Sequence, residues 1–338
     1  MAELRDYTSL RVGGPAKSFI EVGTEEEIIA AIENAGDLPI LIIGGGTNIL
    51  VADNGFAGQV IRITSHELQA EFDACSGATL TIGAGEDWDS FVATTIERGF
   101  AGLETLSGIP GSVGAAPIQN IGAYGHEVSE FITQVRTYDR QANAIKTFTN
   151  QECDFSYRNS HFKAHPGRYV VLHVQFNLRE GEFTTPITYA ELAQKLGVSL
   201  GEKAEVTATR AAVLALRGAK GMLLNPDDRD SWSAGSFFTN PIITNELAAK
   251  LPEGAPRWRT SDGRVKTSAA WLIENSGVSK GDSHGGARVS SKHVLALTNG
   301  GSATAADIAE LARSAQRSVY QKFGIQLEPE VNLIGITL

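Results

Sequence analysis

The chain has 338 residues, of which 42% are hydrophobic and 20% are charged, and its formal net charge is −10 at pH 7. This length exceeds one ordinary hydrophobic core and predicts a globular protein of two or three domains, neither disordered nor fibrous. The negative charge, without a basic run or stripe, excludes a general nucleic-acid binder. It does not exclude an anionic small molecule held by backbone N–H groups and a few arginines.

The cysteine count and the apolar runs indicate the compartment. Cys75 and Cys153 are the two cysteines, and they provide neither a disulfide framework nor metal-ligand spacing. The N-terminus does not combine a basic start with an apolar core, and no apolar run approaches the length of a membrane span. We therefore expect a reduced, cytoplasmic protein without membrane partners.

The first part of the chain predicts a β-α-β arrangement that is then repeated. The segment TEEEIIAAIENAG begins with a capping box formed by Thr24 and Glu27, carries an apolar stripe and stops at Gly36, as helices do. LPILIIGGGTNILV predicts a buried strand that runs into a glycine turn and a second apolar stretch. ATLTIGAGEDWDSFVATTIERG predicts a strand, a glycine turn and a helix up to Gly99.

The middle of the chain changes character. Residues 102–125 hold six glycines and almost no charge, and they match neither a helical nor a strand period. A loop of that length inside a compact domain is usually functional. A hairpin is expected next, with FITQVRTYDR and IKTFT as its strands and residues 141–143 as its turn, followed by the strand RYVVLHVQFNLR.

The last part is richer in helix signals. TYAELAQKLG opens with a second capping box, Thr188 and Glu191, and KAEVTATRAAVLALRGAKG predicts a helix that ends near Gly218, at the boundary to a C-terminal domain. That domain is expected to contain the helix KTSAAWLIENSG, two short strands around ARVSSKHVLALTN, a long helix over residues 304–323 and a closing strand in IQLEPEVNLIGI. The fold class is therefore α+β, and the final strand is expected to rejoin the first domain.

Two glycine-rich segments are candidates for ligand binding. In IGGGTNIL, backbone N–H groups that follow a strand can cradle a phosphate, and Thr47 and Asn48 add side-chain donors. The segment is neither a dinucleotide-binding fingerprint nor a Walker A loop, and its alternative interpretation is a tight turn with positive φ. In residues 109–125 the glycines let the backbone approach a flat ligand, while a glutamine, an asparagine and a tyrosine offer uncharged hydrogen bonds. Together the segments predict one large phosphate-bearing cofactor between two loops.

Three polar residues with apolar or glycine neighbours complete the candidates: Arg158 in DFSYRNSHF, Ser236 in SAGSFFTNP and Glu330 in LEPEVNLIGI. Each alone also fits a structural role, as a surface charge, a turn or cap residue, or an ion pair. Together, an arginine can hold a carboxylate, a serine hydroxyl can protonate a strongly basic carbanion, and a glutamate can stabilise or protonate an enol oxygen. SAGSFFTNP is not a G-x-S-x-G elbow, so it does not indicate a hydrolase nucleophile.

A metal site is not expected. His161 and His165 have the spacing of metal ligands on a helix, but the neighbourhood offers no cysteine and Pro166 stops a continuing helix.

In their residues and in their order along the chain, these motifs closely resemble those of the UDP-N-acetylenolpyruvoylglucosamine reductase family, the MurB family, over nearly the whole chain. The motifs are TSLRVGGPA, GGGTN, GAGEDW, GLETLSGIPGSVGAAPIQNIGAYG, YRNS, AGSFFTNP, AAWLIENSG, HGGARVS and LEPEV. The long glycine loop and AGSFF are highly specific, whereas GGGTN is shared with the wider vanillyl-alcohol-oxidase type of FAD domain.

The resemblance implies a two-lobed FAD-binding domain of the vanillyl-alcohol-oxidase/PCMH type and a C-terminal α+β substrate-binding domain. The first lobe would take residues 1–66 with 326–338, the second lobe 67–216, and the C-terminal domain 217–325. It also implies a cytoplasmic, monomeric flavoprotein oxidoreductase of peptidoglycan synthesis and cell wall biogenesis, without nucleic-acid, membrane or metal partners.

The implied reaction is that of UDP-N-acetylmuramate dehydrogenase. NADPH would reduce FAD, and the hydride would then pass from flavin N5 to the enolpyruvyl ether of UDP-N-acetylglucosamine enolpyruvate. By resemblance, Ser236 protonates the enolate carbon, and Arg158 and Glu330 stabilise the developing charge. The implied FAD contacts are Gly44, Gly45, Gly46, Thr47, Asn48, Ile109, Pro110, Gly111, Ser112, Gly114, Ala115, Ile118, Gln119, Asn120, Gly122, Ala123, Tyr124 and Gly125.

Substrate contacts follow from the same resemblance. Tyr189 matches the subgroup with a substrate-closing tyrosine on an extra segment, while Arg217, Lys220 and Asn240 match diphosphate- and sugar-facing positions. Lys220 is also expected to meet the NADPH phosphates, because both ligands would use one pocket in turn.

The chain departs from the family pattern at a few positions, and two other functions remain open at this point. Thr239 stands where relatives often carry lysine, Asn332 where some carry arginine, and Ala115 and Ala116 where some carry two serines. The first two departures bear on ligand affinity only. The alternatives are an FAD-dependent oxidase or dehydrogenase, which needs no serine proton donor, and a non-catalytic UDP-sugar or flavin-binding module, which needs no such trio.

Overall fold

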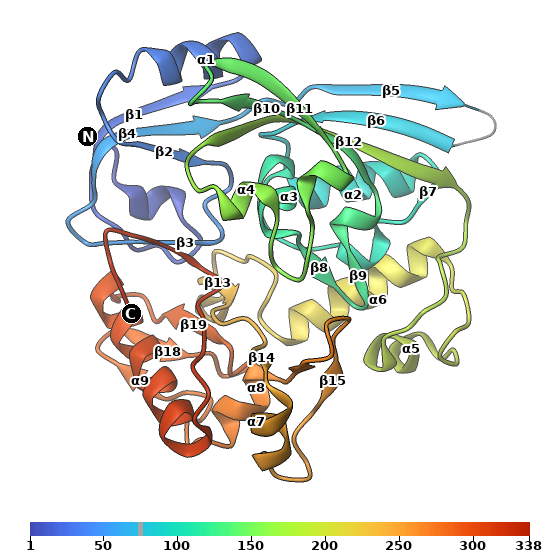
Figure 1. Cartoon of the computed structure of the whole chain (residues 1–338), viewed down its shortest axis with the longest axis vertical. Helices are drawn as coiled ribbons and strands as arrows, with labels where there is room; N and C mark the ends of the chain where they lie inside the picture. The colour runs from blue at the N-terminus through green and yellow to red at the C-terminus, as the bar shows by residue number, and fades with distance from the viewer. Residues whose placement is uncertain (74–76) are drawn as a thin grey trace. The chain divides into compact units, whose positions relative to one another are not determined.

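The structure is a computed structural model that describes residues 1–73 and 77–338. Two compact units can be distinguished (Figure 1). The sheet unit comprises Lys17–Gly45 and Ala57–Ala219, and the terminal unit comprises Met1–Ala16, Gly46–Phe56 and Lys220–Leu338. Cys75 lies outside the described residues.

The sheet unit is built on two larger sheets. In the first, the strand order is β1–β4–β2, with β2 and β4 parallel; the strands are Ala16–Val22, Phe56–Ile63 and Ile40–Ile43. In the second, antiparallel sheet the order is β11–β10–β12–β6–β5, and β7 pairs with β12. These strands are Ala144–Thr149, Ile132–Asp139, Tyr169–Glu180, Gly77–Gly83, Leu68–Asp73 and Phe100–Ala101.

Helices cover both faces of the larger sheet, with α1 on one side and α2 and α3 on the other (Figure 1). The helices of the unit are α1 Glu25–Glu33, α2 Trp88–Glu97, α3 Ala116–Gln119, α4 His161–Ala164, α5 Ala190–Leu196 and α6 Val206–Ala219. The short strands β8 Gly122–Ala123 and β9 His126–Glu127 and the 3-10 helices η2 Glu104–Leu106, η3 Val113–Ala115, η4 Val128–Glu130 and η5 Gln151–Cys153 complete it.

The core of the sheet unit follows from the alternation along the strands and the apolar stripes of the helices. On α2, Trp88 and Phe91 are 1% exposed and pack on Phe176 of β12, with ring centroids 6.1 and 5.0 Å apart. Burying aromatic rings of this size contributes about 1.5–3 kcal/mol each relative to leaving them in water. The α2 helix therefore fixes the glycine turn that precedes it to the sheet.

The predicted signals at α1 are confirmed, and one predicted helix start is wrong. The capping box of Thr24 and Glu27 forms as expected. At α5, however, Tyr189 is the N-cap and no side chain caps the helix, so Thr188 and Glu191 form no capping box. Thr188 lies one residue too early for that role. Its hydroxyl instead packs against Gly125, where an added Cβ would lie 2.5 Å from it.

The terminal unit holds the C-terminal elements together with residues from the start of the chain. Its four-stranded sheet has the order β13–β19–β18–β17 (Ser233–Ser236, Ala296–Asn299, Ala287–Val289, Ser283–His284), and a smaller sheet has the order β14–β16–β15 (Ile242–Ile243, Val265–Lys266, Trp258–Arg259). Its other elements are η1 Leu4–Tyr7, η6 Arg229–Ser231, α7 Asn245–Lys250, α8 Ala269–Glu274, α9 Ala305–Phe323, β3 Ile49–Val51 and β20 Asn332–Ile334.

The final strand returns to the first part of the chain, as expected, because β20 pairs in parallel with β3. The two strands share a hydrophobic core with α9 and the four-stranded sheet. Leu50, Val319 and Val331 belong to that core. The unit boundary at Ala219–Lys220 lies close to the expected end of the long helix. The expected division of the flavin domain into two lobes stays a prediction.

Across the described ranges, no helix is both long and apolar enough to cross a membrane.

Candidate functional site

The loop over residues 44–48 connects β2 to β3, and two of its three glycines, Gly44 and Gly46, are sterically required. A Cβ on Gly46, which has φ +61°, would collide with the carbonyl oxygen of Tyr7, and a Cβ on Gly44 would collide with the hydroxyl of Ser112. In the described part of the chain, the N–H groups of the three glycines donate to no backbone carbonyl, although Gly46 is buried. The loop is therefore both a tight turn and a set of backbone N–H donors. Such a set of donors fits a phosphate.

Asn48, at the end of this loop, also holds the chain around Glu330. Its Nδ2 donates to the carbonyl of Glu330 at 3.2 Å. Its own carbonyl accepts from the backbone N–H and the side-chain Nδ2 of Asn332, both at 3.0 Å. Asn332 therefore has a structural task, because it holds the end of the loop beside the Glu330 segment.

The predicted loop over residues 109–125 is not a plain turn but a chain of short elements. Gly114 needs its lack of a side chain, because an added Cβ would lie 2.5 Å from the Cβ of Ala84. The predicted cofactor residues of the loop lie before η3, on η3 and α3, at the C-cap of α3, and on and after β8: Ile109, Pro110, Gly111, Ser112, Gly114, Ala115, Ile118, Gln119, Asn120, Gly122, Ala123, Tyr124 and Gly125.

Asn120 fixes the shape of this loop. Its backbone is left-handed, with φ +43°. Its Nδ2 donates to the Glu127 carboxylate at 2.8 Å and to the Ser156 carbonyl at 3.0 Å, and its Oδ1 accepts from the N–H of Ser129 at 3.2 Å. The side-chain amide thus binds the loop to its own surroundings.

Gln119 differs from Asn120, because only the oxygen of its side-chain amide has a hydrogen-bond partner among the described residues. Its Oε1 accepts from Lys163 Nζ at 3.0 Å, while its Nε2 is buried and bonds to no described residue. The hydroxyl of Thr105, just upstream of the loop, is likewise buried and unsatisfied within the described chain. Since a buried donor without a partner costs about 1–3 kcal/mol, both atoms fit a ligand that carries hydrogen-bond acceptors.

The Arg158 guanidinium is hydrogen-bonded to the backbone of the same loop. Its NH2 donates to the carbonyl of Gly122 at 2.7 Å and its NH1 to that of Asn120 at 3.3 Å. Its backbone has φ +52°, a conformation that costs a non-glycine residue about 1–3 kcal/mol and persists where the surroundings enforce it. Lys163 Nζ, at 2.9 Å from the Arg158 carbonyl, is one such enforcing contact.

Ser236 ends strand β13 in the terminal unit and is half-buried. The residues around it explain the unusual sequence. Gly235 has φ +70° and lies at a break in the strand register, which re-aims the chain. Phe237 and Phe238 are 1% and 2% exposed, with ring centroids 5.2 Å apart, and they anchor the strand in the core.

Glu330 is brought beside this strand. Its N–H donates to the carbonyl of Phe237 at 2.9 Å. Next to this bond, Phe238 and Pro329 form an isolated antiparallel β-bridge, and the N–H of Thr239 donates to the carbonyl of Glu328 at 3.0 Å. The segments of Ser236 and Glu330 are therefore paired within the terminal unit. Arg158 belongs to the sheet unit, so the predicted trio is divided between the two units.

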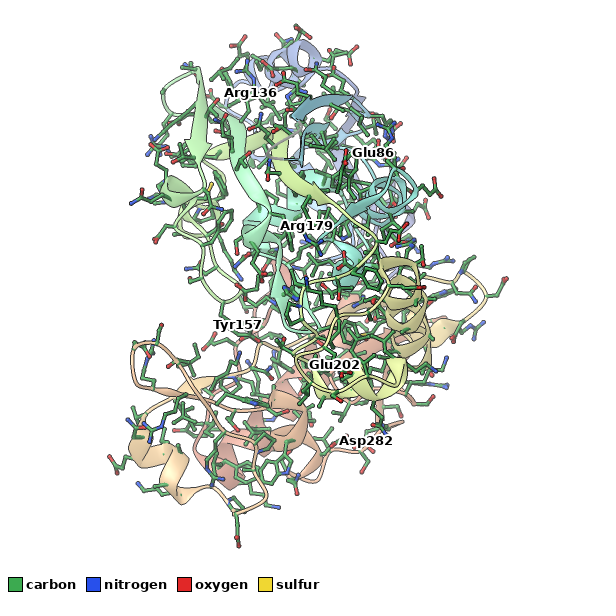
Figure 2. All side chains as sticks on the ribbon, turned by 90° about the vertical axis from the view of Figure 1, so that its right-hand side faces the viewer. Glu86, Arg136, Tyr157, Arg179, Glu202 and Asp282 are labelled. Atoms are coloured by element: carbon green, nitrogen blue, oxygen red, sulfur yellow. The ribbon has the colours of Figure 1, made fainter. Side chains whose placement is uncertain are left out.

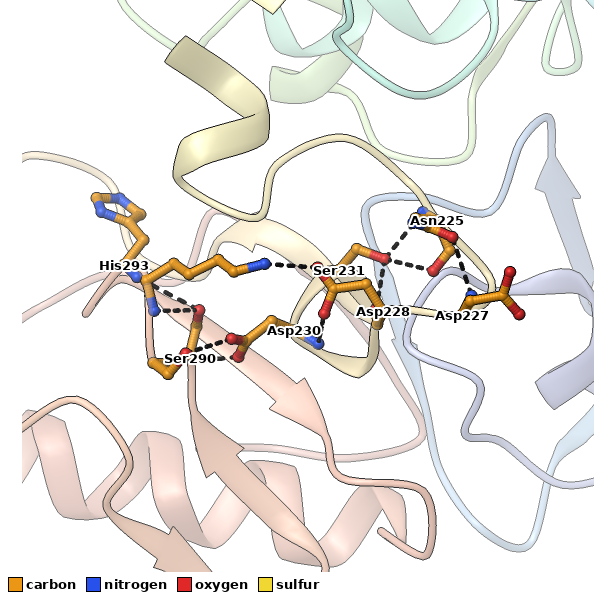
Figure 3. Close-up of polar contacts among 9 residues, drawn as sticks. Asn225, Asp227, Asp228, Asp230, Ser231, Ser290 and His293 are labelled. Atoms are coloured by element: carbon orange, nitrogen blue, oxygen red, sulfur yellow. Dashed lines mark hydrogen bonds and ion pairs between the residues drawn. The ribbon is translucent and has the colours of Figure 1, made fainter. Parts of the chain in front are cut away.

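The segment that leads into β13 is held by a polar network that sequence reasoning missed (Figure 3). Lys292 Nζ donates to Asp228 at 2.5 Å, and Ser291 bonds Asp230 through its hydroxyl and its N–H. The hydrogen bond from Lys292 lowers the pKa of Asp228, and the same bond raises the pKa of Lys292. The acidic run PDDRD was the available signal, but its partners lie about sixty residues away in the chain.

The predicted substrate residues also divide between the units. In the sheet unit, Tyr189 is 43% exposed and meets Tyr124 edge to face, with ring centroids 5.4 Å apart; burial raises the pKa of Tyr124 to about 12. Arg217 on α6 donates through Nε to the Gly108 carbonyl at 3.0 Å, and burial lowers its pKa.

The other two substrate residues, Lys220 and Asn240, belong to the terminal unit. Lys220 follows directly after α6 and is half-buried. The Oδ1 of Asn240 accepts from the N–H of Ala269 at 2.9 Å, at the start of α8, so this side chain serves the fold. The hydroxyl of the neighbouring Thr239 lies 3.4 Å from the Glu328 carbonyl.

The two histidines with metal-like spacing stack on each other. The ring centroids of His161 and His165 are 4.3 Å apart, and the Nδ1 of His165 lies 2.8 Å from the His161 carbonyl. Burial lowers the pKa of His161. Among the described residues there is no group of three or more histidines, cysteines or carboxylates that could hold a metal ion.

Comparison with known proteins assigns both parts of the chain. Residues 16–147 match the family model described as an FAD binding domain, and residues 226–334 match the C-terminal domain of UDP-N-acetylenolpyruvoylglucosamine reductase. The reductase of that name from Cutibacterium acnes is 50% identical, covering 99% of this chain and 90% of that protein. The one from Streptomyces coelicolor is 47% identical, covering 100% of this chain and 90% of that protein.

A solved structure agrees with these relatives. The crystal structure of UDP-N-acetylenolpyruvylglucosamine reductase (MurB) from Thermus caldophilus superposes with a TM-score of 0.68 at 28% sequence identity. The alignment covers 98% of this chain and 97% of that one.

Proposed function

Since the chain belongs to the UDP-N-acetylenolpyruvoylglucosamine reductase family, we propose that it reduces the enolpyruvyl ether of UDP-N-acetylglucosamine enolpyruvate to UDP-N-acetylmuramate with NADPH. The chain is an FAD-dependent oxidoreductase of peptidoglycan synthesis, with an α+β fold that joins an FAD-binding domain to a C-terminal domain. The nicotinamide donor, the order of hydride and proton transfer and the site residues belong to the proposal.

The residues present fit FAD. The cofactor's diphosphate matches the row of glycine N–H groups over residues 44–46, and its carbonyl and nitrogen acceptors match the buried Nε2 of Gln119. When bound, FAD would supply the hydride chemistry, by which two electrons from NADPH would reach the β-carbon of the substrate's double bond as a hydride.

The residues of the chain then handle charge and protons. Arrival of a hydride at the β-carbon leaves an electron pair at the α-carbon, delocalised onto the substrate carboxylate. We assign to Arg158 the binding of that carboxylate, and to Glu330 in its protonated form a hydrogen bond to the enolate oxygen. Ser236 delivers its hydroxyl proton to the α-carbon, which completes the addition of two hydrogens. An alkoxide would result, so the serine must regain a proton from a relay or from water.

The single observation that supports this assignment best is the pairing of the Phe237 carbonyl with the Glu330 N–H at 2.9 Å. It keeps the strand end that carries Ser236 beside the segment that carries Glu330. A serine is a poor acid in water, and it serves as a proton donor only next to a strongly basic carbon and groups that stabilise the same intermediate.

An anaerobic titration tests the proposal directly. The absorption spectrum of the purified protein is recorded first alone, then after NADPH, then after the enolpyruvyl nucleotide sugar. We expect oxidised-flavin bands that bleach with NADPH and return only with the nucleotide sugar. Bands that return only when oxygen is admitted would indicate an oxidase, and a colourless protein that cannot be reconstituted with FAD would leave a binding role.

A further inference from the structure

Asp89, in the first turn of α2, joins three segments of the sheet unit. Its carboxylate receives both arms of the Arg210 guanidinium from α6, at 2.6 Å to Oδ1 and 2.9 Å to Oδ2. The same Oδ1 accepts the N–H of Gly108 at 2.6 Å. A bidentate arginine–carboxylate pair of this kind is geometrically rigid, so α2, α6 and the peptide of Gly108 are held in one arrangement.

Arg217 contacts Gly108 from the other side, at its carbonyl. It lies seven residues after Arg210 on α6, which is close to two helical turns and therefore on the same face. Its Nε donates to the carbonyl of Gly108 at 3.0 Å. Gly108 is thus held at its N–H by Asp89 and at its carbonyl by Arg217, with φ +69°, directly before the loop that begins at Ile109.

The charges of the cluster support a fixed geometry. Burial alone would raise the pKa of Asp89, but the hydrogen bonds from Arg210 and Gly108 outweigh it and the pKa is lowered. Asp89 therefore stays ionised at neutral pH. Arg217 donates to the neutral carbonyl of Gly108, and burial lowers its pKa, an effect that the nearby Tyr124 and Asp89 oppose.

We propose that Asp89 and Arg210 are positioning residues for the reductase reaction, which hold the Gly108 peptide so that the Arg217 guanidinium meets the diphosphate of the nucleotide-sugar substrate. The inference rests on the proposed function, because that function supplies the anionic substrate. Neither residue touches the ligand in this account. Their effect passes through the Gly108 peptide to the Arg217 guanidinium, and the Asp89 charge also acts on that guanidinium directly.

The sheet unit offers a matched control in Glu25 and Arg136. This pair is also bidentate, at 2.9 and 2.8 Å, and also joins a helix, α1, to another element, β10. Arg136 lies near the end of the unit that carries α1, whereas Tyr157, the neighbour of Arg158, lies toward the other end (Figure 2). Removing this pair tests what the loss of an ion pair does to the unit in general.

The experiment uses the FAD-loaded full chain and measures kcat, the KM for the nucleotide sugar, and flavin content by absorbance. Asp89→Ala and Arg210→Gln are expected to raise this KM about tenfold or more, the scale of one charge-assisted hydrogen bond, with kcat changed less than about threefold. Flavin content should stay stoichiometric, and Glu25→Ala should leave the KM unchanged. Asp89→Asn loses the charge that binds Arg210 but keeps an acceptor for the Gly108 N–H, so it replaces Asp89→Ala if that variant does not fold and is expected to raise the KM by a smaller factor.

The decisive measurement is the coupling to Arg217. In an Arg217→Gln background, Asp89→Ala should add little to the KM, because the guanidinium that it positions is already gone. Fully additive effects, an unchanged KM in Asp89→Ala and Arg210→Gln, or an equal rise in Glu25→Ala would overturn the proposal. So would an unchanged KM in Arg217→Gln alone. Absence of turnover by the unmodified enzyme would instead reject the proposed function itself.

Discussion

Ser236 owes its place to the glycine before it. Gly235 has φ +70°, and an added Cβ would meet no atom within 4 Å, so the requirement for glycine there is conformational and not steric. Gly46 differs, because φ is +61° and an added Cβ would also collide with the Tyr7 carbonyl. The same residue type therefore serves two physical needs in the two motifs.

This difference predicts unequal costs of the same substitution. Gly235→Ala should lower the free energy of unfolding by about 1–2 kcal/mol, the cost of a left-handed alanine, and leave FAD bound. Gly46→Ala should cost clearly more and release FAD, because the loop has to shift away from the residue 7 carbonyl. Urea unfolding and flavin content of both variants check this, and equal losses would contradict the distinction.

The proton-donor assignment leads to a second prediction for single residues. Ser236→Ala should leave reduction of the bound flavin by NADPH nearly normal, because no proton is delivered to carbon in that half-reaction. It should slow reduction of the nucleotide sugar by about 10²–10⁴, the usual effect of losing a general acid. Stopped-flow measurement separates the two half-reactions. If both slow equally, Ser236 has a structural role.

At the scale of elements, the β10–β11 hairpin is set by one buried carboxylate. Asp139, at the end of β10, accepts the N–H groups of Gln141 and Ala142 in the turn and the guanidinium of Arg168, the latter at 2.7 Å to Oδ2. The hydrogen bonds, that of Arg168 above all, lower the pKa of Asp139 to about 2 from its ordinary 3.8. Side-chain bonds thus convert a predicted turn into a defined one.

The lowered pKa gives a pH prediction. In the unfolded chain Asp139 takes up its proton near pH 3.8, and in the folded chain only near pH 2. Its contribution to stability is therefore fully present above about pH 4 and is lost as the pH falls through the folded value. Asp139→Asn should be less stable than the unmodified chain at pH 6, with the gap closing between pH 4 and 2. A gap independent of pH would contradict this origin.

Elements were predictable where their signals are local. The α1 cap, the β10–β11 turn and the long helices depend on residues three or four positions apart, and they form where the sequence indicates. The expected capping box at Thr188 fails because Tyr189 takes the N-cap position and the Thr188 hydroxyl packs against Gly125, more than sixty residues earlier. A tertiary contact there overrides a local preference.

For the molecule as a whole, the described chain has two large hydrophobic clusters, one in each unit. FAD should stabilise the protein by mass action, because its donors exist only in the folded loops. At a free concentration of about 100 times the Kd, the expected gain is about 2.7 kcal/mol. Thermal unfolding of the flavin-free protein, with and without added FAD, checks this by a rise in Tm. Riboflavin, which lacks the diphosphate, is the matched control and should give a smaller rise.

What the sequence by itself determined is the α+β class, the local elements, the glycine-rich loops and the family, because these depend on short motifs and on neighbours along the chain. Only the tertiary structure decided that Asn48 holds the Glu330 carbonyl, that Asp89 and Arg210 close on Gly108, and that β20 joins β3. Asn48 and Glu330, Arg210 and Asp89, and β20 and β3 lie far apart in the chain, and the contact of Asp89 with Gly108 belongs to the same cluster as that of Arg210. Their partners are fixed by how the cores pack, and no local pattern in the chain encodes that.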